Sequence, residues 1–412
     1  MLPNYRNLLI IVLFVCPVAC TVAADMKTND VSPPQRSLQQ PKLYVVSSAN
    51  DKFGFIDSDG KLKIDLPDDV YTVFPFSDGL AVIAKRVPNT LGRWGFIDAT
   101  GRVVIAPTFH VARPFSEGLA PIIVREREDS GGKLGYIDTT GRIVIQPQFG
   151  IEGDPSTSGF SEGLAAVPQL NGKWGYIDKT GKFVIAPRFS YASAFSEGRA
   201  WAGIPKAQWS IDSKMGMIDA KGNWVVEPQF DSAGKFSEGL AAIRVDKKMG
   251  YINKQGEIVI KPQFDPFGGC PDSGNKSDRP FSEGLAAVLQ NWKWGYIDHS
   301  GRYVIKPSYD CAEPFSEGLA VIGVRDEKEG AFRYGYIDKT GTIVIQPRFG
   351  FAHSFSGGLA FVSDGMTDEW IWLKGLDDGK SEEQIKKEIE HNQTKKGYID
   401  KTGRFVWQPT AQ

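Results

Sequence analysis

The chain has 412 residues, with 48 lysines and arginines against 49 aspartates and glutamates, so its formal net charge is −1. Because no excess of positive charge is available to neutralise phosphates, the composition argues against a general nucleic-acid-binding protein. Hydrophobic residues make up 41% and charged residues 24%, which is ordinary for a globular protein and excludes wholesale disorder.

The first 24 residues have the pattern of an export signal. Arg6 gives a positive start, residues 8–15 form a continuous apolar run, and residues 22–24 (Val-Ala-Ala) fit the small-x-small rule for cleavage. The apolar run is too short to be a permanent membrane span. We therefore predict a signal peptide over 1–24, a linker over 25–40, and a mature protein outside the cytoplasm, either periplasmic or secreted.

The same segment also has features of a lipoprotein signal. Residues 17–20 (Pro-Val-Ala-Cys) resemble a bacterial lipobox, in which Cys20 would carry the lipid, although proline replaces the usual aliphatic residue. We favour ordinary cleavage; lipidation of Cys20 would anchor the protein to a membrane. Beyond the signal the sequence contains only Cys270 and Cys311, which could pair in an oxidising compartment or remain as two free thiols.

One motif recurs along the rest of the chain. It reads Trp-Gly-Tyr-Ile-Asp at residues 174–178, continues as Lys-Thr-Gly-Lys-Phe-Val-Ile-Ala-Pro, and has a period of about 40 residues. Most versions are preceded by Phe-Ser-Glu-Gly-Leu-Ala or a close variant. The central glycines of the nine versions are Gly54, Gly95, Gly135, Gly175, Gly216, Gly250, Gly295, Gly335 and Gly397.

Each unit predicts three short strands. β-Branched and aromatic residues fill Leu-Ala-x-Val, then Trp/Tyr-Gly-Tyr-Ile-Asp, then Arg/Lys-x-Val-Ile. The Asp-x-x-Gly between the second and third strands, as in residues 178–181, predicts a tight turn, because Asp bonds backbone N–H groups and Gly accepts the left-handed conformation. A proline after the third strand, such as Pro187, is expected to end its pairing. Residues 43–46 can supply the first strand of the first unit.

The third strand is apolar on both faces, and this predicts how the units pack. Phe183 and Ile185 face one way and Val184 faces the other. A sheet that is apolar on both faces must be covered on both, most simply by the neighbouring units. We therefore predict an all-β fold of nine three-stranded antiparallel units stacked like blades over 41–409. Because both end units look complete, we favour an open superhelical solenoid over a closed propeller-like ring.

This pattern resembles the bacterial WG-repeat family, also called KWG repeats, over about residues 41–409. Gly-Tyr-Ile-Asp, Asp-x-x-Gly and Phe-Ser-Glu-Gly-Leu-Ala recur together in order, and Trp-Gly stands at Trp94, Trp174 and Trp294. The resemblance implies an all-β repeat array whose members are often exported. It implies no defined activity and supplies no catalytic residue. Other residues replace the tryptophan in the remaining units: Phe53, Leu134, Met215, Met249, Tyr334 and Lys396.

Two insertions interrupt the array. Residues 265–280 are rich in Gly, Pro, Asp and Ser and are expected to form a loop. Residues 364–395 form the longer insertion, in which Ser381 to Gln384 matches a capping box and predicts a short helix near 381–391. This helix either packs on the end of the array or contacts a partner.

The sequence lacks the usual catalytic motifs, so we predict that the protein is not an enzyme and has no cofactor. The nucleophile-elbow, zinc-protease, Walker A and Rossmann patterns do not occur, and the four histidines, His110, His299, His353 and His391, share no partner spacing. Carboxylates do recur in two ladders, one in the Asp-x-x-Gly turns and one in the Ser-Glu-Gly segments, and such groups could bind calcium. Because Asn253 and Gly357 interrupt these ladders, we interpret both as structural and predict no metal.

We predict a non-catalytic binding or scaffold protein that presents its repeat loops to a protein partner, without nucleic acid and without a transmembrane segment in the mature chain. The alternative is a glycan- or cell-wall-binding module, because exposed aromatic rings stack on sugars. The least favoured hypothesis is an enzyme with a site built from several units. Candidate ligand contacts are the tryptophans that the repeat explains least: Trp201, Trp209, Trp292, Trp370 and Trp372.

Overall fold

A computed structural model describes most of the repeat array. The described residues are 42–47, 52–127, 131–151, 159–205, 213–266, 279–325, 332–365, 380–390 and 395–409. All of them belong to one compact unit over residues 41–412, and residues 1–40 form the other unit. The predicted signal peptide, the linker and Cys20 therefore lie outside the described residues.

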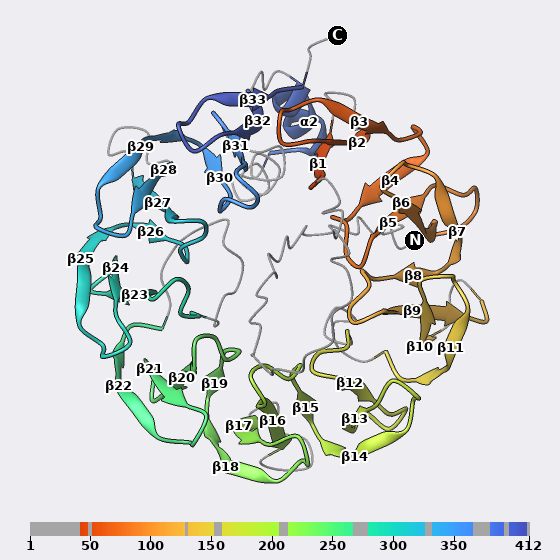
Figure 1. The fold of residues 1–412 in the computed structure, drawn as a ribbon, viewed down its shortest axis with the longest axis horizontal. Coiled ribbons are helices and arrows are strands. Elements are labelled where there is room, and N and C mark those ends of the chain that lie inside the picture. Colours follow the sequence, from red (N-terminus) through yellow and green to blue (C-terminus); the bar gives the residue numbers. More distant parts are fainter. Residues whose placement is uncertain are drawn as a thin grey trace, which may run out of the picture. The chain divides into compact units, whose positions relative to one another are not determined.

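The described strands of this unit form nine antiparallel sheets arranged as the blades of a closed ring (Figure 1). We number the blades 1 to 9 in chain order and name the strands of a blade A to D from the inner to the outer edge of the ring. Blade 2, for example, has the order β4-β5-β6-β7. The preference for an open solenoid was therefore wrong, and the fold is a nine-bladed propeller.

Strands B and C are the first two predicted strands of each unit. The B strands are β1 (Tyr44–Ser47), β5 (Leu80–Lys85), β9 (Leu119–Arg125), β12 (Ala165–Pro168), β16 (Ala200–Pro205), β20 (Leu240–Val245), β23 (Ala286–Gln290), β27 (Leu319–Arg325) and β31 (Ala360–Ser363). The C strands are β2 (Phe53–Ile56), β6 (Arg93–Asp98), β10 (Gly132–Asp138), β13 (Trp174–Ile177), β17 (Ser213–Ile218), β21 (Lys248–Asn253), β24 (Lys293–Ile297), β28 (Phe332–Asp338) and β32 (Lys396–Ile399).

Strand D is the third predicted strand, and strand A is a fourth that the sequence did not predict. Among the described residues, blades 1, 4 and 7 have no strand A. The A strands are β4 (Val70–Val73), β8 (Val111–Ala112), β15 (Tyr191–Ala192), β19 (Ser232–Ala233), β26 (Cys311–Ala312) and β30 (Phe351–Ala352). The D strands are β3 (Leu62–Asp65), β7 (Val103–Phe109), β11 (Ile143–Phe149), β14 (Phe183–Phe189), β18 (Trp224–Phe230), β22 (Ile258–Phe264), β25 (Tyr303–Tyr309), β29 (Ile343–Phe349) and β33 (Phe405–Trp407).

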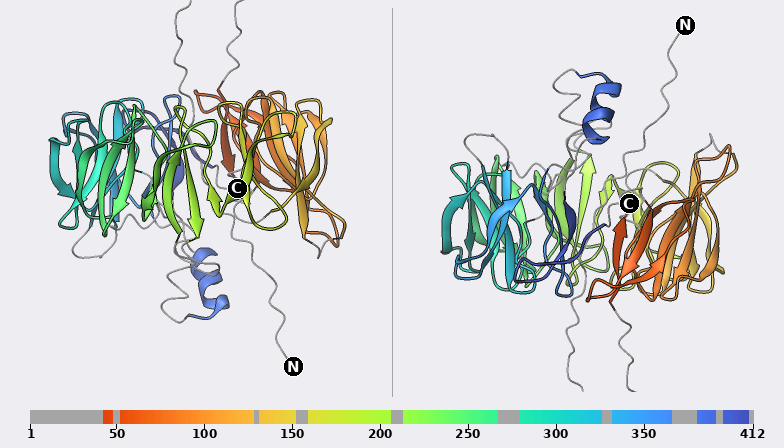
Figure 2. Two further views of the ribbon diagram at one scale, coloured as in Figure 1. Left: turned by 90° about the horizontal axis from the view of Figure 1, so that it is seen from below. Right: turned by 90° about the horizontal axis from the view of Figure 1, so that it is seen from above.

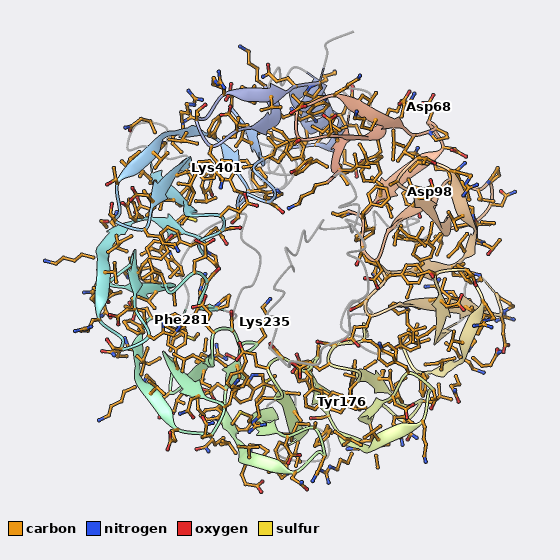
Figure 3. The ribbon with its side chains drawn as sticks, viewed as in Figure 1. Asp68, Asp98, Tyr176, Lys235, Phe281 and Lys401 are labelled. Atoms are coloured by element: carbon orange, nitrogen blue, oxygen red, sulfur yellow. The ribbon has the colours of Figure 1, made fainter. Side chains whose placement is uncertain are left out.

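The hydrophobic core lies between neighbouring blades. One buried cluster joins Tyr176 and Phe189 of blade 4 to Phe195 and Ile218 of blade 5. The Tyr176 and Phe195 rings lie 4.8 Å apart, and the Tyr176 hydroxyl donates to a main-chain oxygen of blade 5. Figure 3 shows the side chains filling the space between blades, with Lys235 at the inner edge of the ring. Strands B and C are thus covered on both faces, as predicted.

Strand D departs from two predictions. Val184 of β14 is half exposed, so the outer strand is not covered on both faces; the first two apolar positions of several D strands also face solvent. Pro187 does not end the strand, because pairing resumes at Phe189, opposite Trp174. Proline is tolerated there because strand D is an edge strand and carries a β-bulge.

The bulge explains the glycine of the Trp-Gly dipeptide. A Cβ on Gly175 would lie 2.6 Å from the Ile185 carbonyl oxygen and 2.8 Å from the Pro187 nitrogen. Both of these atoms belong to the backbone of strand D and cannot rotate away. A residue with a side chain at this position would push strand D off the sheet.

The ring closes in part by contacts of the kind that join the other blades. Tyr398 of blade 9 donates to the Val45 carbonyl of blade 1 at 2.7 Å, as Tyr176 donates to blade 5 at 2.8 Å. Gly60 of blade 1 packs against Val406 of blade 9, just as the equivalent Gly181 packs against Ile145 of the preceding blade. All described strands of blades 1 and 9 come from their own ends of the chain, so no sheet is shared.

The topology separates two faces of the ring. The A–B turns (Ser-Glu-Gly) and the C–D turns (Asp-x-x-Gly) lie on one face, which we call the turn face. The B–C hairpins and the connections from each strand D to the next blade lie on the opposite face, which we call the loop face. The helix α2 (Glu382–Glu390) belongs to the B–C connection of blade 9 and projects from one side of the ring (Figure 2).

Helix α2 begins with the predicted capping box. The Ser381 main-chain N–H donates to Gln384 Oε1 at 2.9 Å, and the Gln384 N–H donates to Ser381 Oγ at 3.3 Å. These reciprocal bonds satisfy donors that the first turn leaves without partners. The prediction of one short helix in this insertion is confirmed.

Candidate functional site

The first carboxylate ladder builds the C–D turns. Asp178 Oδ1 accepts from the N–H groups of Thr180 and Lys182, and the Gly181 N–H donates to the Asp178 carbonyl. Asn253 makes the same two backbone contacts through its amide oxygen. The carboxylates of this ladder are therefore occupied by their own turns.

Hydroxyl donors within these turns lower the pKa of several aspartates. The Ser300 hydroxyl bonded to Asp298 is the largest cause that lowers the pKa of Asp298 to about 2. Bonds from threonine hydroxyls act in the same way on the pKa values of Asp98, Asp138, Asp178 and Asp338.

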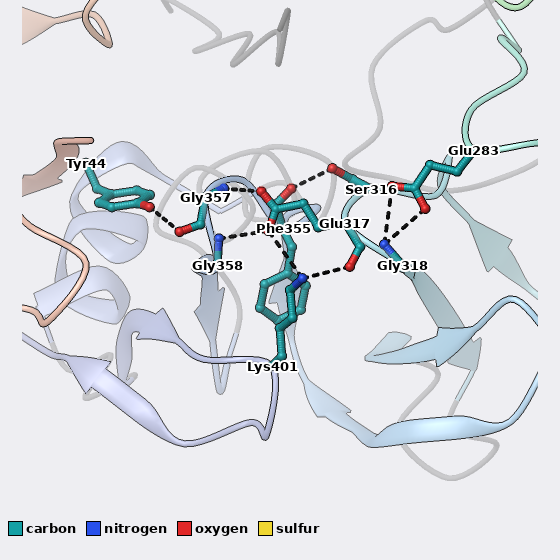
Figure 4. A network of polar contacts seen from close by, with 9 residues as sticks. All are labelled: Tyr44, Glu283, Ser316, Glu317, Gly318, Phe355, Gly357, Gly358 and Lys401. Atoms are coloured by element: carbon teal, nitrogen blue, oxygen red, sulfur yellow. Dashed lines mark hydrogen bonds and ion pairs between the residues drawn. The ribbon is translucent and has the colours of Figure 1, made fainter. Parts of the chain in front are cut away.

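The second ladder joins consecutive blades from blade 2 to blade 9 across the turn face. In blade 7, Glu283 accepts from the Gly318 N–H of blade 8 at 3.0 Å, and Ser282 Oγ donates to the Phe315 carbonyl at 2.7 Å. Glu317 and Ser316 repeat this pattern towards blade 9, where Glu317 accepts from Gly357 and Gly358 (Figure 4). The glutamate has a positive φ in each described case, which its bond to the next blade offsets.

Basic side chains from the C–D turns complete these junctions. Lys339 of blade 8 lies 3.0 Å from Glu283, and Lys401 of blade 9 lies 3.5 Å from Glu317. His299 takes the lysine position between blades 6 and 7, 3.2 Å from Glu238, and stacks on Phe281. The turn face is thus occupied by contacts that hold the ring together.

Gly357 interrupts the second ladder because the ring closes there. Its carbonyl accepts from the Tyr44 hydroxyl of blade 1 at 2.5 Å (Figure 4). A Cβ at this position would lie 2.3 Å from a Lys42 side-chain carbon and 2.4 Å from the Tyr44 hydroxyl oxygen. Glycine therefore makes room for the first blade.

The loop face is where the repeat units differ. All nine C–D turns have the same length and hydrogen bonds. The B–C connections range from two residues in blades 6 and 7, at 246–247 and 291–292, to the helix-bearing insertion 364–395 of blade 9. The other insertion, 265–280, also lies in a connection of this face. A scaffold that is constant on one face and variable on the other presents the variable face for recognition.

A third carboxylate series supports the loop face, and the sequence analysis missed it. Asp265 accepts from Lys248 of its own blade at 2.7 Å and from the Asn291 N–H of blade 7 at 2.8 Å. Asp310 accepts in the same way from Lys293 at 2.5 Å and from the Arg325 N–H at 3.0 Å. Asp231 of blade 5 bonds Lys214. The signal that could have revealed this series is a lysine 17 residues before each aspartate.

These ion pairs also change the acidity of the aspartates. The bonded lysine is the largest cause that holds the pKa values of Asp231 and Asp265 below the usual range. At neutral pH the hairpin of blade 7 is therefore held by charged groups that are already paired. No group of three or more potential metal ligands occurs among the described residues.

Large apolar side chains stand in water on this face. Trp292 is 78% exposed at the tip of the hairpin of blade 7, and Leu91 and Leu170 in the corresponding connections of blades 2 and 4 are 69% and 68% exposed. They are the three most exposed large apolar side chains among the described residues.

The other predicted contacts have different positions. Trp201 is only 2% exposed, because it fills the junction between blades 5 and 6, where its Nε1 donates to the Gly234 carbonyl at 2.6 Å. The expectation of an exposed contact at Trp201 was therefore wrong. Trp209, Trp370 and Trp372 lie outside the described residues, as does Cys270. Cys311 is buried and disulfide-bonded, and its pairing with Cys270 stays a prediction.

The described histidines do not converge on one site. His110 accepts from the Arg125 N–H at 3.2 Å on the loop face, and His299 lies on the turn face. His353 packs against Phe351 in blade 9. His391 lies outside the described residues. None of the described helical residues forms a segment long and apolar enough to cross a membrane.

Solved structures share the fold at low sequence identity. One titled "Crystal structure of the eukaryotic initiation factor" is 11% identical, with a TM-score of 0.58, covering 90% of this chain and 96% of that chain. This likeness shows the propeller fold alone. A puromycin hydrolase structure (11% identity, TM-score 0.37, 72% and 50% of the two chains) and the propeller domain of the Trilobed protease from Pyrococcus furiosus (10%, 0.32, 68% and 98%) are more distant.

Sequence comparison identifies the repeat. None of the curated proteins matches the chain significantly. The family model described as "WG containing repeat" matches residues 94–126, 135–174, 174–203, 215–248, 249–266, 294–326 and 334–365. These stretches cover more than half of the chain, and most of them run from strand C of one blade to strand B of the next. The chain belongs to the family of proteins built from WG containing repeats.

Proposed function

We propose that this propeller is a non-catalytic binding protein that presents its loop face to a protein partner outside the cytoplasm. The repeat family and the propeller fold are those of a binding or scaffold domain. The observation that carries the proposal is that the connections vary on the loop face and hold the three most exposed large apolar side chains of the described residues, Leu91, Leu170 and Trp292, opposite a turn face filled with inter-blade bonds. An ordered surface of this kind suits a macromolecular partner.

The cellular location is part of the proposal. It rests on the export-signal pattern of residues 1–24, and the disulfide at Cys311 is compatible with an oxidising compartment. Release after cleavage and lipid anchoring through Cys20 differ in one measurable way. Mass spectrometry of the mature N-terminus distinguishes a chain that starts after residue 24 from one that starts at a lipidated Cys20.

A site-specific photo-crosslinker tests the partner. p-Benzoylphenylalanine is introduced at Leu170 on the loop face or at exposed Thr139 in a C–D turn, in cells of the source organism. We expect a defined protein adduct from position 170 and none from position 139. Adducts of equal yield from both positions, or from position 139 alone, would contradict the assignment of the loop face.

The exposure of Trp292 also favours the alternative function, in which the ligand is a glycan. Retention of the purified protein on peptidoglycan and on a glycan array measures it directly. Retention that disappears in Trp292→Ala would replace the protein partner with a glycan.

A further inference from the structure

The hairpin between β23 and β24 holds a tryptophan in a backbone conformation that bulky residues rarely adopt. Asn291 and Trp292 connect the paired residues Gln290 and Lys293, and their φ angles are 52° and 61°. Two positive φ angles are typical of a type I′ turn, whose preferred sequence is Asn-Gly. The chain has the expected asparagine but carries tryptophan where glycine would be free of strain.

Burial of the Trp292 side chain does not compensate for this backbone strain. Its side chain is 78% exposed, whereas Trp94, Trp174 and Trp294 of the repeat motif are buried between blades. A small residue at position 292 would avoid both the backbone strain and the exposure of a large apolar side chain. A strained and solvent-exposed aromatic residue of this kind points to a role in recognition.

The hairpin is held rigidly from both neighbouring connections. Asp265 at the end of blade 6 accepts from the Asn291 N–H at 2.8 Å, and Lys293 lies 2.5 Å from Asp310, which also bonds blade 8 through the Arg325 N–H. An aromatic side chain on such a support loses little conformational freedom when it binds.

The protruding shape of this hairpin indicates which kind of ligand can bind it. A hairpin tip protrudes, whereas sites for small molecules and sugars are concave and need free polar groups beside the aromatic ring. The carboxylates that support the hairpin, Asp265 and Asp310, are already bonded to lysines and backbone N–H groups. A protruding tryptophan therefore needs a partner that supplies the pocket.

We propose that Trp292 is the anchor of the loop-face interface and inserts into an apolar, indole-sized pocket of a folded protein partner. This inference rests on the proposed function and names the residue and the partner chemistry through which it operates. Tryptophan is the residue type most often found as such an anchor, surrounded by contacts of little energetic weight.

The equivalent hairpin of blade 6 supplies a matched variant. Lys247 occupies the position of Trp292 there, with a φ of 63°, so Trp292→Lys keeps a hairpin that the fold already accepts. Trp292→Gly removes the indole and also the strain. We expect the unfolding midpoint of Trp292→Lys to equal that of the wild type and that of Trp292→Gly to rise. A large fall in both midpoints would assign the indole a structural role and overturn the proposal.

Binding is measured by competition for a cross-link. Protein carrying p-benzoylphenylalanine at Lys247, beside the anchor, or at Leu170 is irradiated in an extract of the source organism with unlabelled competitor. Wild type and the control Val184→Ala, which shortens an exposed apolar side chain of an outer strand, are expected to suppress the adduct, whereas Trp292→Lys and Trp292→Gly require concentrations about tenfold higher or more.

The outcomes separate this inference from the proposed function. An adduct from position 170 that Trp292→Lys suppresses as well as wild type overturns the anchor and leaves the loop-face function intact. Absence of adducts from both positions overturns both proposals. Binding to a glycan array, or to vesicles of phosphatidylcholine and phosphatidylglycerol, that is lost in Trp292→Lys would replace the protein pocket with that ligand.

Discussion

At the scale of single residues, the repeated glycines and acids mark places where backbones come close. Gly175 lies against the backbone of strand D, and Gly181 combines a φ of 84° with packing against Ile145 of the preceding blade. Asp178 satisfies two N–H groups of its own turn. The residues that recur most regularly therefore serve construction, and those that break the pattern are the candidates for recognition.

The close approach at Gly175 gives a stability prediction. Gly175→Ala places a methyl group 2.6 Å from the Ile185 oxygen and should lower the free energy of unfolding by about 3 kcal/mol. Gly163→Ala is the control, because its Cβ meets no atom within 4 Å and only its positive φ is strained, which costs about 1 kcal/mol. Urea denaturation measures both, and equal losses would contradict the explanation of the Trp-Gly dipeptide.

The turn aspartates give a prediction for acid. Since the folded-state pKa of Asp298 is lowered to about 2, its stabilising effect is complete above the unfolded value of about 3.9 and is lost as pH falls through about 2. Asn253 shows that the turn forms without the charge. Asp298→Asn should therefore lose less stability than the wild type between pH 5 and pH 2 in chemical denaturation. An equally steep loss would show that Asp298 is not among the groups responsible.

At the scale of elements, the Ser-Glu-Gly turn is both the hairpin of one blade and the connector to the next. The glutamate adopts a positive φ, with values of 50–55° including Asp78, and its carboxylate then reaches the neighbouring turn. The A strands are short and the D strands carry a β-bulge. Contacts with the neighbouring blade therefore supply part of the stability of each blade.

Removing one glutamate of the second ladder should weaken the contact between two neighbouring blades. Glu283→Ala deletes the bond to the Gly318 N–H and the ion pair with Lys339, and should lower the free energy of unfolding by about 1–2 kcal/mol. Glu227→Ala on an outer strand is the control and should change it by less than about 0.5 kcal/mol. Thermal unfolding of both variants measures this difference. Similar unfolding midpoints for the two variants would show that the ladder does not stabilise the junction.

At the scale of the whole molecule, the described strands close a ring of nine junctions with no sheet shared between the two ends of the chain. The junction of blades 9 and 1 keeps the glycine packing of the other junctions and the tyrosine bond that several of them have. It lacks the glutamate connector, which the bond from Tyr44 to Gly357 replaces. Ring closure is thus achieved by side chains alone.

This replacement makes ring closure sensitive to alkali. Burial, and then the charge of Glu317, raise the pKa of Tyr44 from 10.0 to about 12. A raised pKa means that the stabilisation is complete below pH 10 and is lost as pH rises through about 12. Tyr44→Phe should be about 1 kcal/mol less stable than the wild type at pH 8, and the difference should shrink at pH 11. A constant difference across these two pH values in urea denaturation would contradict this account.

Much of the fold follows from local patterns in the sequence. The Asp-x-x-Gly turns, the capping box at Ser381 and the B and C strands depend on residues close in the chain, and the structure has them where expected. Ring closure cannot be predicted from these local patterns, because it depends on the small angle between neighbouring blades summed over nine units. Completeness of the end units, which we interpreted as a sign of an open stack, is compatible with closure through ordinary junctions.

The candidate site was less accessible to sequence reasoning. Trp201 departs from the repeat consensus as Trp292 does, yet one fills a junction and the other stands in solvent. Their difference depends on position in the blade, since Trp201 lies in a central strand and Trp292 at a hairpin tip. The aspartates at 231, 265 and 310 lie outside the recurring motifs, and the only sign of their partners is the lysine 17 residues before each of them.

Among the described strands no sheet combines the two ends of the chain, and this has an evolutionary consequence. In a ring that is fastened by a strand from the opposite terminus, a change in repeat number must preserve both halves of one special unit. Here an in-frame duplication or deletion within the gene adds or removes an internal unit, and the contact between Tyr44 and Gly357 that joins the two end units is left unchanged. Lineages descended from such an ancestor can therefore change ring size in single steps.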